Sequence, residues 1–170
     1  KHTWGFTQSE TLVLYAAIGA VYVAAALASG PLVRRLMRMG ASMRTQLAGI
    51  IVVQAGACLL PLLGPEGRWV ALVTAVVVTW LTAMKWPVME SYLSAGRHGH
   101  AMRVAVGWFN VVWMVAVALP MFGLASVLVG EGRWALAVLG GANLAALPAL
   151  WWFGSVPPPH AAEAAAGHVR

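Results

Sequence analysis

A lysine and a glutamate interrupt the segment WLTAMKWPVMESYLSAG, which otherwise holds apolar and hydroxyl side chains. Lys85 lies two residues before Pro87 and five before Glu90. Five helical positions are about 140° apart around the axis, so Lys85 and Glu90 are not expected to pair within one helix. Glu90 is expected to serve the end of the helix, against Arg97 or Arg103. Lys85 is left as a cation that burial would make a proton carrier.

The proline beside this lysine is expected to bend a helix that contains it. Pro87 has no N–H to donate and crowds the carbonyl of Ala83, which loses its helical partner. Inside a bilayer such a defect needs protein or water next to it. Thr82 and Lys85 are three positions apart and share a helix face, so both side chains should meet the same surroundings.

The composition of the chain indicates which solvent surrounds these residues. Of 170 residues, 61% are hydrophobic and 9% are charged, whereas about a quarter of the residues of a soluble domain are charged. Long charge-free runs follow one another, and about 20 apolar residues suffice for a helix to cross a bilayer. The predicted fold class is an all-α integral membrane protein, a bundle of about five transmembrane helices. The expected spans are 11–30, 45–64, 69–94, 104–129 and 134–153, so that residues 1–153 form the bundle and 154–170 a cytoplasmic tail or the start of a central linker.

The depth of Lys85 depends on where the third span ends. If the span runs to Ser94, Lys85 lies about 15 Å from the inner end, beyond the reach of its own side chain. A charge at that depth costs roughly 2.5 kcal/mol or more and normally faces a cavity or a partner. If the span ends at Met84, it is about 24 Å long and Lys85 is an ordinary interfacial anchor. The sequence leaves both possibilities open.

Basic residues gather in alternate loops. Residues 30–44 carry four arginines and no acid, and residues 96–103 carry two more arginines, whereas the loops PEGR and GEGR each carry one glutamate and one arginine. Lys and Arg near helix ends favour the cytoplasmic side. We therefore predict a multi-pass protein of the inner or plasma membrane, with its N-terminus outside and its C-terminus in the cytoplasm. The net charge of +6 is interpreted as this topology signal, and no nucleic-acid partner is expected.

Few residues carry the chemistry of an enzyme or a metal centre. The sequence holds no nucleophile–base set, no phosphate-binding loop and no CxxC pair. His98 and His100 lack a nearby acid or cysteine and make a poor metal site. We expect no enzyme activity, no cofactor and no metal. Asn110, in GWFNVVWMV, is expected either to make an interhelical hydrogen bond or to line a substrate path.

Three segments follow the order and spacing of motifs in one family of transporters. SGPLVRRLMRMG follows the first span and matches the loop pattern G-x-L-A-D-R-x-G-R-R at Gly30, Leu32 and Arg35, with Arg38 close behind. KWPVMESYLSAG is followed by a short basic loop and VGWFNVVW, and LPMFG (119–123) partly matches a Gly-Pro-x-x-Gly-Gly helix bend. In this order the three segments resemble the major facilitator superfamily of secondary transporters.

The resemblance implies that the five spans are helices two to six of such a transporter, whose first helix and C-terminal half are missing from the chain. It implies alternating access of a small-molecule substrate to a cavity within the lipid bilayer, with proton coupling as an option. The implied substrate path contains Tyr15, Tyr22, Thr82, Lys85, Asn110 and Trp113. The implied cytoplasmic gate loop contains Gly30, Arg34, Arg35 and Arg38, with Glu90 beside it, and helix bends lie at Pro87 and Pro120. Arg34 replaces the acidic residue of the family's loop motif, and Met37 replaces its inner glycine.

Two other functions are compatible with the sequence. The first is a non-transporting multi-helix membrane subunit or sensor. The second is an intramembrane enzyme, which would need a polar catalytic pair that the sequence does not contain. The genomic reading frame separates transporter from subunit, because further spans before and after the chain favour a transporter.

Overall fold

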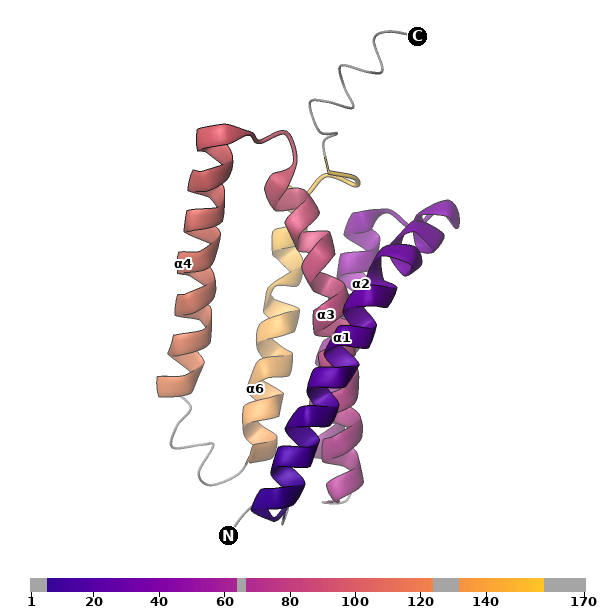
Figure 1. Ribbon diagram of the computed structural model, residues 1–170, viewed down its shortest axis with the longest axis vertical. Helices are drawn as coiled ribbons and strands as arrows, with labels where there is room; N and C mark the ends of the chain where they lie inside the picture. Colours follow the sequence, from indigo (N-terminus) through magenta and orange to yellow (C-terminus); the bar gives the residue numbers. More distant parts are fainter. Residues whose placement is uncertain (1–5, 64–66, 124–131, 158–170) are drawn as a thin grey trace, which may run out of the picture.

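The computed structural model of the chain describes residues 6–63, 67–123 and 132–157. These residues form helices and short connections, and no strand occurs among them. The elements are α1 (Gln8–Arg38), α2 (Met43–Leu63), α3 (Arg68–Ser94), α4 (Gly99–Gly123), α6 (Gly132–Ala145) and the 3₁₀ helix η1 (Leu147–Trp152) (Figure 1). The described part of the chain has five helical segments that are long and apolar enough to cross a membrane, which confirms the all-helical class.

Successive long helices run in opposite directions (Figure 1). One end of the bundle therefore collects the α1–α2 connection, the α3–α4 connection and the residues after η1. We name it the arginine-rich end; its described residues include one acid, Glu90, and the six arginines Arg34, Arg35, Arg38, Arg44, Arg97 and Arg103. The opposite end holds the first residues of α1 and α3.

The first helix is longer than its predicted span, which ended at residue 30. It continues through Pro31 to Arg38, so most of the predicted arginine loop is helical. Val33 is 8% exposed and belongs to the same buried cluster as Leu47 of α2. Apolar packing thus continues the helix past the point where Pro31 removes a hydrogen bond. Figure 1 shows the last turns of α1 leaning outward from the bundle.

The third helix is continuous through Lys85 and Pro87 and ends at Ser94. The helix itself therefore does not end at Met84. Its 27 residues correspond to about 40 Å at the usual helical rise. This exceeds the roughly 30 Å of a hydrocarbon core, so Lys85 lies well inside a helix that is long enough to span.

The last two helices also differ from their predicted bounds. α4 begins at Gly99, five residues before the predicted span, and the part of that span beyond Gly123 lies outside the described residues. Pro120 lies inside α4. α6 ends at Ala145, and a proline at the second position of η1 accompanies the change to a tighter 3₁₀ turn. The predicted tail is described only as far as residue 157.

The second helix is the centre of the packing. It contacts α1, α3, α6 and η1, and half of the residues in its most apolar stretch are buried. The main buried cluster joins four elements near the arginine-rich end; its members are Val33, Leu47, Ile51, Val88 and Leu150. In contrast, among the described elements α4 packs only against α3, and Figure 1 shows it standing apart from the others.

A glycine allows the close contact between α2 and α6. A Cβ atom added at Gly140 would lie 3.1 Å from the carbonyl oxygen of Ala55 and 3.2 Å from the Cβ of Cys58. Small residues let membrane helices approach in this way. A Cβ at the next residue, Gly141, would meet nothing within 4 Å, so only one of the two glycines is required by packing.

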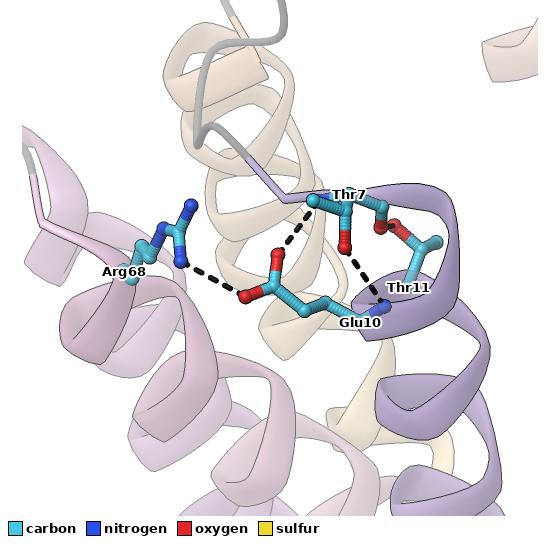
Figure 2. A network of polar contacts seen from close by, with 4 residues as sticks. All are labelled: Thr7, Glu10, Thr11 and Arg68. Carbon is cyan, nitrogen blue, oxygen red and sulfur yellow. Dashed lines mark hydrogen bonds and ion pairs between the residues drawn. The ribbon is translucent and has the colours of Figure 1, made fainter.

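At the opposite end, a capped helix start is tied to a second helix (Figure 2). The Thr7 hydroxyl accepts a hydrogen bond from the Glu10 N–H at 3.2 Å, and the Glu10 carboxylate accepts one from the Thr7 N–H at 2.7 Å. This is a capping box, which satisfies N–H groups that the first turn leaves unpaired. The second carboxylate oxygen of Glu10 lies 3.1 Å from Nη1 of Arg68, which starts α3. The contact holds the first turns of α1 and α3 together.

At the arginine-rich end, the residues after η1 fold back onto α2 and α3. The Tyr92 hydroxyl donates to the carbonyl oxygen of Gly154 at 2.8 Å, and its ring meets that of Phe153 edge-on at 4.9 Å. From α2, the Arg44 N–H donates to the carbonyl of Ser155 at 3.4 Å. We name residues 153–156 the terminal strap.

Tyr92→Phe should loosen this strap while leaving the ring contact in place. The variant loses the donor that the carbonyls of Gly154 and Ser155 share, and such a hydrogen bond typically contributes about 0.5–1.5 kcal/mol. We expect faster amide hydrogen exchange within residues 153–156 by up to about tenfold, and little change in α2. Tyr22→Phe is the matched control, because the exposed Tyr22 hydroxyl has no hydrogen bond to the described residues. Equal exchange in both variants would contradict the role of the Tyr92 hydroxyl.

Candidate functional site

A chain of hydrogen bonds links three polar side chains between α2 and α3. The Lys85 ammonium donates to Oε1 of Gln54 at 3.0 Å. The Gln54 amide Nε2 donates to the Thr82 hydroxyl at 2.8 Å. The Thr82 hydroxyl in turn donates to the carbonyl of Val78 at 2.7 Å. We name Lys85, Gln54 and Thr82 the polar triad.

The helices place the triad at one depth. Lys85 is nine residues before the end of α3, and Gln54 is eleven residues after the start of α2. At 1.5 Å per residue, both lie about 14–16 Å from the arginine-rich end. Because α2 and α3 run in opposite directions, these positions come side by side. Thr82 lies one turn from Lys85 on the same face of α3, which brings its hydroxyl to the other end of the Gln54 amide.

The triad carries a positive charge without a negative partner among the described residues. Gln54 is 4% exposed and neutral, while Lys85 is half-buried. The ion pair that the described part of the chain does form, between Glu10 and Arg68, lies at the opposite end. An ammonium group has more than one N–H to donate, and Gln54 takes only one. The remaining donors of Lys85 have no partner among the described residues, so the site can bind an oxygen atom, an anionic one most strongly.

Two of the six residues proposed for a substrate path, Thr82 and Lys85, lie together in the polar triad. The other four, Tyr15, Tyr22, Asn110 and Trp113, are exposed. Trp113 and Phe109 of α4 contact the Trp86 ring edge-on, with centroids 5.2 and 5.5 Å apart. The Asn110 side chain makes no hydrogen bond with the described residues. Asn110 and Trp113 stay away from the polar triad because, among the described elements, α4 meets only α3. Tyr15 and Tyr22 lie on exposed positions of α1.

Gln54 was not among the residues that the sequence analysis assigned to a site. The signal was present in the spacing. Gln54 and Lys85 lie at nearly equal depth in consecutive antiparallel helices, and a buried amide needs a hydrogen-bonding partner. Comparing the depths of polar residues in neighbouring spans would have paired them.

The residues proposed for a gate loop lie in or near helices. Gly30, Arg34, Arg35 and Arg38 belong to the last turns of α1. The Arg34 guanidinium folds back over Gly30, where an added Cβ would lie 3.5 Å from Nη1. Buried Gln46 of α2 then fixes the turn after α1, since its amide nitrogen donates to the carbonyls of Val33 and Ala41.

The expected pairing of Glu90 with Arg97 or Arg103 is wrong. Glu90 is exposed and forms no ion pair with either residue in the described part of the chain. Nη1 of Arg97 instead donates to the carbonyls of Tyr92 and Leu93 at 3.1 and 2.6 Å. These carbonyls belong to the last turn of α3 and lack helical partners, so Arg97 acts as a cap for that helix.

Metal ligands do not gather in the described residues, where no three His, Cys, Asp or Glu side chains form a group that could hold an ion. Asn143 donates to the carbonyl of Leu139 within its own helix at 2.9 Å.

Comparison with known proteins found no match for the chain among family models, curated proteins or solved structures. The polar triad therefore has to be interpreted from its own chemistry.

Proposed function

We propose that the chain is part of a secondary active transporter similar to the major facilitator superfamily, embedded in the inner or plasma membrane. In this proposal the arginine-rich end faces the cytoplasm, and the helices move a small molecule by alternating access. Five apolar helices of spanning length support the membrane location. The excess of arginine at one end supports the orientation.

The observation that carries the proposal is the half-buried Lys85 ammonium on a neutral amide. A charge at this depth in a bilayer costs about 2.5–3.5 kcal/mol, and hydrogen bonds from a neutral glutamine offset only part of that. A protein that only needed a stable α2–α3 contact would be better served by an apolar residue. We therefore propose that Lys85 binds the anionic group of the transported molecule. Lysine also exchanges a proton, which suits coupling of transport to a proton gradient.

The test is uptake into sealed vesicles that contain the protein expressed from its complete reading frame. Small carboxylates and phosphates, neutral solutes and organic cations are offered in parallel, with and without an imposed proton gradient. We expect saturable uptake of at least one anion and none of the cations. A proton gradient should stimulate this uptake if protons drive it.

The alternative function, a membrane subunit or sensor, predicts no uptake of any solute. In that case the positive charge of Lys85 would be matched by a carboxylate of a neighbouring membrane helix. Crosslinking from position 85 to a second protein, together with inactive vesicles, would favour the alternative and contradict transport.

A further inference from the structure

A groove opens at the arginine-rich end between α3, α4 and the terminal strap. It has a volume of about 490 Å³, and its walls include Met89, Leu93, Arg97, Phe109, Trp152 and Val156. α4 contributes Phe109, and the other lining residues come from α3, the residue Arg97 after it, η1 and the terminal strap. The groove is separate from the polar triad, none of whose residues lines it.

The groove changes from charged to apolar along its length. Arg97 follows the end of α3 at Ser94, whereas Met89 lies five residues before that end and so about 8 Å deeper. Phe109, ten residues into α4, adds an apolar wall at about 15 Å. Trp152 is 84% exposed and stands near the charged mouth, where indole rings favour the headgroup level of a bilayer.

Arg97 is held in place with donors to spare. Its Nη1 is fixed by the carbonyls of Tyr92 and Leu93. The other guanidinium N–H groups have no partner among the described residues and form the planar fork that suits a phosphate. The acid nearest in sequence, Glu90, does not pair with it. A fixed arginine of this kind at the mouth of an apolar groove is complementary in charge to a phosphate that carries an acyl chain.

The same combination recurs on another side of η1. A second groove of about 630 Å³ is lined by Arg44, Thr45 and Ala48 of α2 and by Leu147, Leu150 and Trp151 of η1. Here too an arginine and a highly exposed tryptophan, Trp151 at 87%, accompany aliphatic walls. Both grooves thus combine one arginine and one exposed tryptophan with apolar walls.

We propose that the Arg97 groove binds an anionic phospholipid of the surrounding bilayer. The lipid phosphate accepts hydrogen bonds from the Arg97 guanidinium, and one acyl chain lies against Met89 and Phe109. The inference rests on the membrane location and orientation proposed above and is independent of transport. Basic pockets between helices on the cytoplasmic side suit acidic headgroups in this way.

Native mass spectrometry of the full chain in mixed micelles tests the groove. The micelles contain phosphatidylglycerol and phosphatidylcholine with identical acyl chains in equal amounts. We expect retention of phosphatidylglycerol, and a loss of about fivefold in its binding for Arg97→Gln. Arg103→Gln is the matched control, because Arg103 is exposed at the same end but does not line the groove. It should change binding less than twofold.

A second variant keeps the charge and removes the space. Val156→Trp places a ring in the groove and should also weaken phosphatidylglycerol binding, with Arg97 intact. Excess inorganic phosphate should not displace the lipid. No preference for phosphatidylglycerol, equal losses in Arg97→Gln and Arg103→Gln, or displacement by free phosphate with Val156→Trp unaffected would each overturn the proposal. Vesicles that move no solute, from a protein that retains the lipid, would overturn transport alone.

Discussion

Lys85→Met should stabilise the helical bundle in micelles while abolishing anion uptake into vesicles. Methionine has similar length and volume, so the packing between α2 and α3 is kept. The partly desolvated charge is removed, and Gln54 still donates to Thr82. The Gln54 carbonyl oxygen loses its donor, which offsets part of the gain. Replacing buried charged groups by apolar ones of similar shape is often stabilising by about 1–4 kcal/mol. We expect an increase of about 1–3 kcal/mol in the free energy of unfolding, measured by denaturant titration.

Replacing Gln54 instead of Lys85 tests the other partner of this hydrogen bond. Gln54→Leu leaves the Lys85 ammonium without its acceptor in the described structure, which should cost about 1–3 kcal/mol. The double variant, Lys85→Met with Gln54→Leu, should regain most of that stability, because no unpaired charge is left. A Lys85→Met protein that is less stable than the wild type would show that the lysine is structural.

The second expected result for Lys85→Met is the loss of anion uptake. Without a cation in the triad, a transported anion loses its counter-charge, and uptake should fall to background. Lys85→Arg keeps the charge and should retain measurable uptake. If Lys85→Met transports as well as the wild type, Lys85 has no part in the substrate path, whatever its effect on stability.

Gly140→Leu should separate α6 from α2 and strongly destabilise the bundle. The added side chain would begin 3.1 Å from a backbone carbonyl oxygen of α2, which cannot rotate away. Overpacking of this kind typically costs about 1–3 kcal/mol, and here it acts on the central helix. We expect a lower unfolding midpoint and faster hydrogen exchange in both helices.

Gly141→Leu is the matched control for this effect. It makes the same chemical change one residue later on the same helix, where an added Cβ meets nothing within 4 Å. Leucine has a higher helix propensity than glycine, by up to about 1 kcal/mol, so Gly141→Leu should be neutral or slightly stabilising. Equal destabilisation by the two variants would show that the contact at Gly140 is not specific.

The helices themselves were predictable from the sequence because apolar runs of spanning length have few other uses. Their ends were less predictable. Arg34 and Arg35 suggested a loop, yet Val33, which comes just before them, is buried against α2 and continues the helix. Charge indicates which end of a span meets water, whereas burial of the next apolar residue decides where the helix stops.

Two of the three residues of the polar triad were predictable. Lys85 stood out as a charge within an apolar run, and Thr82 followed from its place on the same face. Gln54 required knowledge of which helices are neighbours. Tyr15, Tyr22, Asn110 and Trp113 are exposed in the structure, and their place in a substrate path stays a prediction. Periodicity within one segment states which residues share a face, but not which helix that face meets.

The direction of the hydrogen bonds in the triad has a consequence for what the site can sense. An ammonium can only donate, so Lys85 forces the carbonyl oxygen of Gln54 toward itself and the amide nitrogen toward Thr82. The Thr82 hydroxyl must then donate its hydrogen bond to the carbonyl oxygen of Val78. An amine that has given up its proton can accept instead, which permits the Gln54 amide to flip and the Thr82 hydroxyl to reverse. The protonation state of the Lys85 nitrogen therefore sets the direction of the hydrogen bonds that connect α3 with α2.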